Sequence, residues 1–296
     1  MKLLKIIDLR KKKPGNSRVV SARTRGEGRV SPLRQRRKKV KIYVTALGVA
    51  VFILVASLAS ESTYHQKISI GPISVSGVSR ISPRLVKAVF EKTLHDGMNH
   101  FFSRSNVLWY PKHELEKAIL SGIPRTASVS ITREGLFAQA ITVTIEERKR
   151  FGFWCSDSSL QKGQRCFEMD ENGFIFAALA SETPLYGIIF SGPLSASTTL
   201  IGQTFIGEHM SGVVAFLKKL ENKNLKPIRV STTDMVDYWV ELPETVLVRV
   251  AFGADPEETA RNLELALSSD ALRGRVEELE YIDLRFGNRL YYKVKR

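Results

Sequence analysis

The sequence predicts an α+β protein with one transmembrane helix followed by two domains. The first is small, with the order strand, helix, helix, strand, strand, and the second is a mixed, mainly antiparallel β domain with two main helices. Three observations predict this class. An uncharged apolar stretch follows a basic one, helices with apolar faces alternate with strands up to residue 147, and short strands dominate beyond it.

The excess basic charge lies almost entirely in residues 1–41. These contain 16 Lys or Arg and two acids, whereas the rest of the chain has a net charge of only +1. The later domains therefore have no bulk charge for nucleic acid, and none is expected as a partner. We interpret residues 1–41 as a disordered cytoplasmic tail that also attracts anionic lipid.

Residues 42–60, IYVTALGVAVFILVASLAS, are predicted to anchor the chain in a bilayer. As a helix they extend about 28 Å, close to the ~30 Å hydrocarbon core. A cleavable signal peptide is the alternative, but such peptides have an apolar stretch of about 7–15 residues and a shorter leader. Because Arg34–Lys41 precedes the helix, the amino terminus is expected inside and residues 61–296 outside.

Residues 66–146 are predicted to form the small domain. A strand-like run starts at Ile68, and Ser82-Pro83 begins a helix that continues to Leu94. A second helix starts at Pro111 and ends before Pro124. Two strands, TASVSITR and AQAITVTIEE, complete a sheet covered by helices on one face, which leaves a sheet edge exposed.

Residues 147–296 are predicted to form the β domain. The strands in RFGFWC and CFEMDENGFIFAAL come before a main helix at residues 207–224. Three further strands lie in LKPIRVSTT, DYWVEL and TVLVRVAFG. Asp255-Pro256 then begins another helix that runs through Leu267.

Two cysteines, Cys155 and Cys166, bracket a polar loop between apolar runs. A disulfide across a hairpin is favoured outside the membrane and would stabilise the fold by roughly 2–3 kcal/mol. Free buried thiols are the second interpretation, and a nucleophile is the third.

The stretch YIDLRFGNRLYYKVKR, residues 281–296, has apolar residues at the even positions from Ile282 to Val294 except Asn288. This alternation predicts half-buried strands, and Gly287-Asn288 suits a two-residue hairpin turn. YIDLRF is then an inner strand and RLYYKVKR the outermost one. Asp283 and Arg285, two residues apart on the polar face, are expected to form a structural ion pair.

The sequence contains no recognisable motif for catalysis, for a metal or for a cofactor. The five histidines are scattered, KHELE lacks the second His of a zinc-protease helix, and the sequence has no phosphate loop or Gly-x-Ser-x-Gly elbow. The sequence therefore predicts a protein that is not an enzyme and holds no cofactor.

The order of these segments resembles the FtsQ/DivIB family of bacterial division proteins. ISVSGVSRISPRLV resembles the opening of a POTRA domain, and IPRTASVSITREGLFAQAITVTIEERKRFGFW resembles the end of an FtsQ-type POTRA domain. Pro124, Glu147-Arg148 and Trp154 stand at the family's positions, although RKRFGFW lacks a Pro that usually follows Glu-Arg. The strand YIDLRFGNRLYYK, with Asp283-Leu284-Arg285, resembles the strand that ends the family's β domain.

The resemblance implies a non-enzymatic, single-pass scaffold at the division septum of the cell (inner) membrane, with a POTRA domain at residues 66–146. It implies FtsB/DivIC-like and FtsL-like coiled-coil proteins as partners of the β domain, besides other divisome membrane proteins. By position in the motif, the partner-binding residues are Phe286, Gly287, Asn288, Arg289, Leu290, Tyr291 and Tyr292. Backbone groups of Arg289 and Tyr291, or of Leu290 and Tyr292, would pair with an added strand.

Two other classes stay open. A membrane-anchored cell-wall enzyme of the sortase or transpeptidase type would need a reactive Cys near His or Arg, and the spacing of Cys155 and Cys166 favours a bond between them instead. A POTRA-containing export component would normally add a β-barrel or repeated POTRA units.

Overall fold

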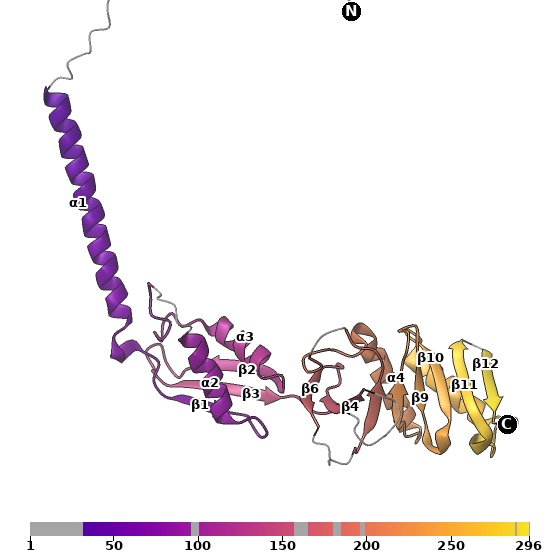
Figure 1. Cartoon of the computed structure of the whole chain (residues 1–296). Helices are drawn as coiled ribbons and strands as arrows, with labels where there is room; N and C mark the ends of the chain where they lie inside the picture. The colour runs from indigo at the N-terminus through magenta and orange to yellow at the C-terminus, as the bar shows by residue number, and fades with distance from the viewer. Residues whose placement is uncertain are drawn as a thin grey trace, which may run out of the picture. The chain divides into compact units, whose positions relative to one another are not determined.

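A computed structural model describes residues 32–95, 101–156, 165–179, 185–195, 199–287 and 289–295 (Figure 1). The chain divides into two units, Met1–Ala59 and Ser60–Arg296. The protein is α+β, as predicted, with one long helix followed by a three-stranded and a nine-stranded sheet. Both sheets belong to the unit Ser60–Arg296, so the predicted domain boundary at residue 147 stays a prediction.

The long helix α1 spans Pro32–Thr63 and is long and apolar enough to cross a membrane. It begins ten residues before the apolar stretch, so residues 32–41 are helical and not part of a disordered tail. The reason is local, because Pro32 suits the first turn of a helix and the Arg, Lys and Gln residues that follow are good helix formers. Residues 1–31 of the predicted tail lie outside the described residues.

The small sheet contains β1 (Ile73–Ser76), β2 (Thr126–Thr132) and β3 (Ile141–Glu147) in the order β1-β3-β2. β1 is parallel to β3, and β2 is antiparallel to it. Helices α2 (Pro83–Leu94) and α3 (Lys112–Gly122) bury one apolar stripe each against the sheet. The elements of this part follow one another as strand, helix, helix, strand, strand. Its core includes Val86, Phe90, Leu115, Ile119, Ile131 and Val143.

The large sheet has the strand order β12-β11-β10-β9-β8-β7-β4-β5-β6. Three of its neighbouring pairs are parallel and five antiparallel, so it is mixed and mainly antiparallel, as predicted. The first seven strands are β4 (Gly152–Cys155), β5 (Cys166–Met169), β6 (Ile175–Ala178), β7 (Ile188–Ser191), β8 (Arg229–Ser231), β9 (Asp237–Glu241) and β10 (Leu247–Ala251), followed by β11 (Leu279–Phe286) and β12 (Arg289–Val294).

Two helices, α4 (Met210–Asn222) and α5 (Pro256–Ser268), pack on this sheet. Asp255 caps α5 by accepting a 2.7 Å hydrogen bond from the Glu258 N–H, and Pro256 occupies the first turn, as the sequence predicted. The main core of the sheet lies beneath them and includes Phe190, Phe216, Leu220, Val240, Val248, Leu263 and Ile282.

Strand β7 is absent from the sequence prediction, although it lies between β4 and β8 near the centre of the sheet. Its apolar run is only Ile188, Ile189 and Phe190, between Gly187 and Gly192. Both glycines have positive φ, 130° and 153°, a backbone conformation that glycine adopts more readily than other residues. The run is buried on both faces, so it lacks the alternation that marks half-buried strands.

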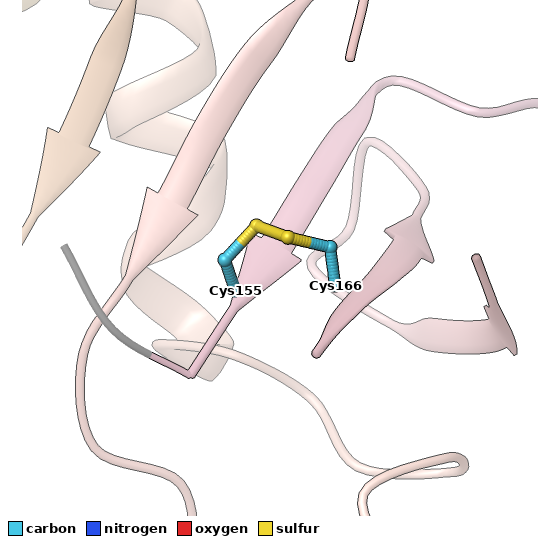
Figure 2. The surroundings of a disulfide bond; sticks show 2 residues. All are labelled: Cys155 and Cys166. Carbon is cyan, nitrogen blue, oxygen red and sulfur yellow. A yellow bond between two sulfur atoms is a disulfide. The ribbon is translucent and has the colours of Figure 1, made fainter. Parts of the chain in front are cut away.

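Cys155 and Cys166 are bonded to each other, which confirms the favoured interpretation (Figure 2). They stand directly opposite each other on the antiparallel strands β4 and β5. Both are buried in a small cluster with Phe153 and Ile189. Because the chain has two cysteines and both are in this bond, it offers no thiolate in this oxidised state.

Charged side chains link the two sheets. Glu147, at the end of β3, accepts hydrogen bonds from the N–H groups of Ser79, Arg80 and Ile81 at 2.6, 2.8 and 2.9 Å. Glu168 of β5 is buried and accepts from Arg80 at 3.1 Å and from Arg125 at 2.6 Å. The end of the small sheet that carries Glu147 is therefore joined to the large sheet.

Candidate partner-binding edge

The predicted partner-binding residues form a β-hairpin at the edge of the large sheet. β11 and β12 lie side by side at the end of the sheet (Figure 1). They are antiparallel, and Phe286 pairs with Arg289 across the turn, as predicted. Gly287 has a φ of 59°, the left-handed conformation that two-residue hairpin turns need. Asn288 lies outside the described residues.

The edge of β12 presents its backbone in a defined pattern. Lys295 donates its N–H to the Glu278 carbonyl at 2.7 Å, so its backbone faces β11. Both irregularities of the pairing place the extra residue in β11, and β12 itself is regular. Since backbone groups alternate along a strand, those of Leu290 and Tyr292 face away from β11. Of the two pairings that the sequence left open, this geometry favours Leu290 and Tyr292.

One face of β12 adjoins helix α5. Leu290 and Val294 are half-buried against the main core, and Tyr292 is 47% exposed. Leu290 and Tyr292, with Leu265 and Ala266 of α5, line a groove of about 320 Å³. A strand added to this edge would therefore place alternate side chains beside an apolar groove, which is how strand addition acquires specificity.

The other face of the hairpin is aromatic and exposed. Phe286 and Tyr291 are 53% and 52% exposed, and their rings meet edge to face with centroids 5.3 Å apart. The Arg285 guanidinium lies over the Phe286 ring at 5.3 Å. These contacts hold two large side chains in fixed positions at the surface, as is common in binding sites.

A buried network of charges lies next to this hairpin. Arg285 donates to Asp283 at 2.8 Å and to Asp237 at 2.8 Å, and Arg249 also donates to Asp237. Burial alone raises the pKa of Asp283, but the hydrogen bonds from Arg285 and the charge of Arg249 outweigh it and hold that pKa below its usual value. The same bond to Asp283 raises the pKa of Arg285. The predicted ion pair of Asp283 and Arg285 is confirmed, and both groups stay charged.

The structure differs from the predicted alternation at Phe286 and Tyr292. Both stand at even positions with buried Ile282 and Leu284, yet both are about half exposed. For Phe286 the reason is the irregular pairing between Asp283 and Phe286. An extra residue in β11 at this point places the side chains after it on the opposite face of the sheet. Tyr292 lies on the α5 side but beyond the core, over the groove.

Sequence reasoning missed Asp237 and Arg249, which complete the charge network, and the α5 side of the groove. Asp237 is far from Arg285 in sequence, so no spacing signal connects them. Among the described residues no cluster of His, Cys, Asp or Glu suits a metal ion. No protein-family model matches the chain, and no curated protein shows significant similarity to it.

Proposed function

We propose that this chain is a membrane-anchored scaffold of the FtsQ/DivIB type, which binds a small coiled-coil division protein at the edge of β12. In this proposal α1 crosses the cell membrane once with its amino terminus inside, and residues 61–296 lie outside. The partners are FtsB/DivIC-like and FtsL-like proteins, and the place of action is the division septum. No chemical reaction is assigned to the chain.

One observation carries the proposal: among the strands that the structure describes, β12 is the last of the large sheet, and it directs the backbone of Leu290 and Tyr292 outward. An uncovered strand edge is a template for another strand, and proteins usually cover it or place charge on it. Here exposed aromatic side chains flank the edge on one face and an apolar groove on the other. A partner strand would form hydrogen bonds with the outward backbone groups. It would also cover the exposed aromatic side chains and the apolar groove.

The residues behind the family resemblance also have defined roles. Glu147 and Arg148 lie where the two sheets meet, and Arg148 donates to the Pro124 carbonyl at 3.1 Å and to Asp170 at 2.6 Å. Trp154 is buried in the core of the large sheet. These contacts suit a POTRA domain followed by a β domain, which is the assignment we propose for the small and large sheets.

The cysteine-dependent enzyme is disfavoured by the bond between Cys155 and Cys166. A cysteine nucleophile acts as a thiolate near a basic group, and a sulfur in a disulfide has no thiolate to offer. Both sulfurs are also enclosed by apolar neighbours, because each cysteine is buried. The bond therefore serves the fold in this proposal.

The test is capture of FtsB/DivIC-type and FtsL-type proteins by the full chain purified in detergent. We expect capture by the chain and none after residues 289–296 are deleted. If the chain without residues 289–296 still captures these proteins, the proposal that this edge binds the partner is wrong. The deleted chain must keep its Cys155–Cys166 bond and its thermal transition, which shows that the rest of the large sheet is folded.

A matched variant separates the edge from its surroundings. Tyr186 is 77% exposed and belongs to a part of the chain between β6 and β7. Tyr186→Ser removes an exposed aromatic side chain as Tyr292→Ser does, but not at the edge. We expect Tyr292→Ser alone to weaken capture. Equal weakening by both substitutions would mean that general surface apolarity, and not this edge, drives association.

A further inference from the structure

Large apolar side chains are exposed together at one end of the small sheet. Trp109 is 70% exposed, and Leu136 and Phe137 are each 69% exposed. The full set is Tyr64, Phe101, Phe102, Leu108, Trp109, Leu136 and Phe137. A group of exposed apolar side chains of this kind indicates a surface that contacts a membrane or another protein. Single exposed apolar side chains are common on protein surfaces.

The topology explains why these residues share one end. β1 and β3 run in parallel toward the end that holds Glu147, so the segment before β1 and the turn before β3 lie at the opposite end. There the Gln139 side chain donates to the Gln66 carbonyl at 2.7 Å, and Gly71 donates to the Gln139 carbonyl at 2.9 Å. Arg133 donates to the Val107 carbonyl. The turn at residues 133–139 and the loop at residues 101–109 are thus neighbours.

The loop at residues 101–109, here called the aromatic loop, is fixed by hydrogen bonds to Thr63. Asn106 is 1% exposed and donates to the Thr63 carbonyl at 3.0 Å, and Ser103 donates its N–H to the Thr63 hydroxyl at 3.0 Å. Its rings pack on one another: Phe101 and Phe102 have centroids 4.9 Å apart, and Phe102 stacks on Trp109 at 6.4 Å. Buried polar groups therefore fix a loop whose apolar rings face outward.

The same end of the unit is where the apolar stretch stops. Ser60 is the last residue of the uncharged run, and its hydroxyl donates to the Phe101 carbonyl. If the run ends at the border of the hydrocarbon core, Phe101 lies at that border too. The interfacial region on each side of a bilayer is about 5–8 Å thick, and Phe101 begins the aromatic loop next to it.

We propose that the aromatic loop and the turn at Leu136–Phe137 insert into the outer interfacial region of the bilayer and hold the small sheet against the membrane. The occupant of this surface is lipid, because Ser60, the last residue of the uncharged run, contacts Phe101 of this surface. Trp and Tyr are the side chains enriched at this depth, where rings meet acyl chains and polar groups meet water. The inference rests on the proposed membrane anchor but not on any division partner.

The test uses the full chain in lipid nanodiscs with Trp109 as the only indole, through Trp154→Phe and Trp239→Phe. Phospholipids brominated on the upper acyl chain quench an indole only when it enters the bilayer. We expect Trp109 to lose most of its emission in brominated discs. The control chain carries Trp109→Phe and Tyr186→Trp in the same background, so its one indole is exposed elsewhere, and we expect it to keep its emission.

Two outcomes overturn the inference. If Trp109 is quenched no more than the control indole, the loop does not enter the bilayer, even though the anchor holds. If the chain does not float with vesicles at all, the anchor proposal fails and this inference fails with it. A second variant pair adds a check on Trp109: Leu136→Ser with Phe137→Ser should reduce its quenching, whereas Leu85→Ser with Leu120→Ser, on α2 and α3, should not.

Discussion

Arg285 donates a 2.8 Å hydrogen bond from Nη1 to Oδ2 of Asp237, a residue 48 positions earlier in the chain. The Asp237 side chain is 4% exposed and also lies 2.9 Å from Arg249 Nη2. A carboxylate buried between two guanidinium groups is stable because both replace the water that it has lost. This contact connects β9 to β10 and β11, so it fixes the sheet against which the edge hairpin is built.

We predict that Asp237→Ala lowers the free energy of unfolding by about 2–4 kcal/mol, because two guanidinium groups lose their buried partner. The measurement is denaturant unfolding of the full chain in detergent, followed by tryptophan fluorescence. Glu280→Ala is the matched control, since it also removes a carboxylate from an ion pair, with Lys293 at 2.8 Å, but at the surface. No measurable change is expected there. Equal effects of the two variants would contradict a special role for the buried network.

A second prediction concerns Glu147, whose carboxylate holds the turn after β1. Burial raises its pKa, but the N–H groups of Ile81, Ser79 and Arg80 outweigh burial and lower the pKa from its ordinary value of 4.5 to about 2. The folded state therefore favours the charged form. Its stabilisation is fully present above pH 4.5 and is lost as the pH falls toward 2.

Glu147→Gln is therefore expected to lower the free energy of unfolding at neutral pH by about 1–2 kcal/mol, a figure kept small because solvent screens the site. The difference between the two proteins should shrink as the pH falls from 4.5 to about 2. The adjacent Glu146, which accepts from the Ser128 hydroxyl at 3.1 Å, supplies the control Glu146→Gln. A difference that stays constant with pH would show that the charge of Glu147 is not what stabilises the turn.

Much of the fold follows from local signals. Asp255-Pro256 and Ser82-Pro83 each mark a helix start, and Gly287 marks the hairpin, because caps and turns depend on residues close in sequence. The contact of Asp237 with Arg285 depends on strand pairing across β9, β10 and β11 and has no local signal. Strand β7 was missed for a related reason, since three buried apolar residues show no period. Phe286 was predicted on the buried face but is exposed, because an irregular pairing moves its side chain to the other face of the strand. The sequence carries no signal for this irregularity.

The third prediction concerns the bond between Cys155 and Cys166, which closes a loop with a sequence separation of 11. Replacing both cysteines with Ser should lower the free energy of unfolding by about 2–3 kcal/mol, because the unfolded chain regains the entropy of an open loop. Partner capture should persist in the folded variant, since β4 and β5 lie in the half of the large sheet opposite to β12. Loss of capture without loss of folding would instead favour a functional thiol.

The last prediction separates the backbone of the edge from its side chains. The N–H of Tyr292 faces away from β11, so Tyr292→Pro removes a donor that no bond within the sheet uses. The N–H of Tyr291 faces Asp283, so Tyr291→Pro removes a bond of the sheet itself. We therefore expect Tyr292→Pro to abolish partner capture with little change in thermal stability, and Tyr291→Pro to lower thermal stability.

Tyr292→Thr completes this comparison because it shortens the side chain but keeps the N–H and suits a strand. If strand addition is the mode of binding, Tyr292→Thr should weaken capture less than Tyr292→Pro does, since the main chain supplies affinity and the side chains supply specificity. Equal losses would mean that the partner recognises the tyrosine ring over the α5 groove and does not extend the sheet. Capture titrations on the three variants, each with its own thermal melt, distinguish the two modes of binding.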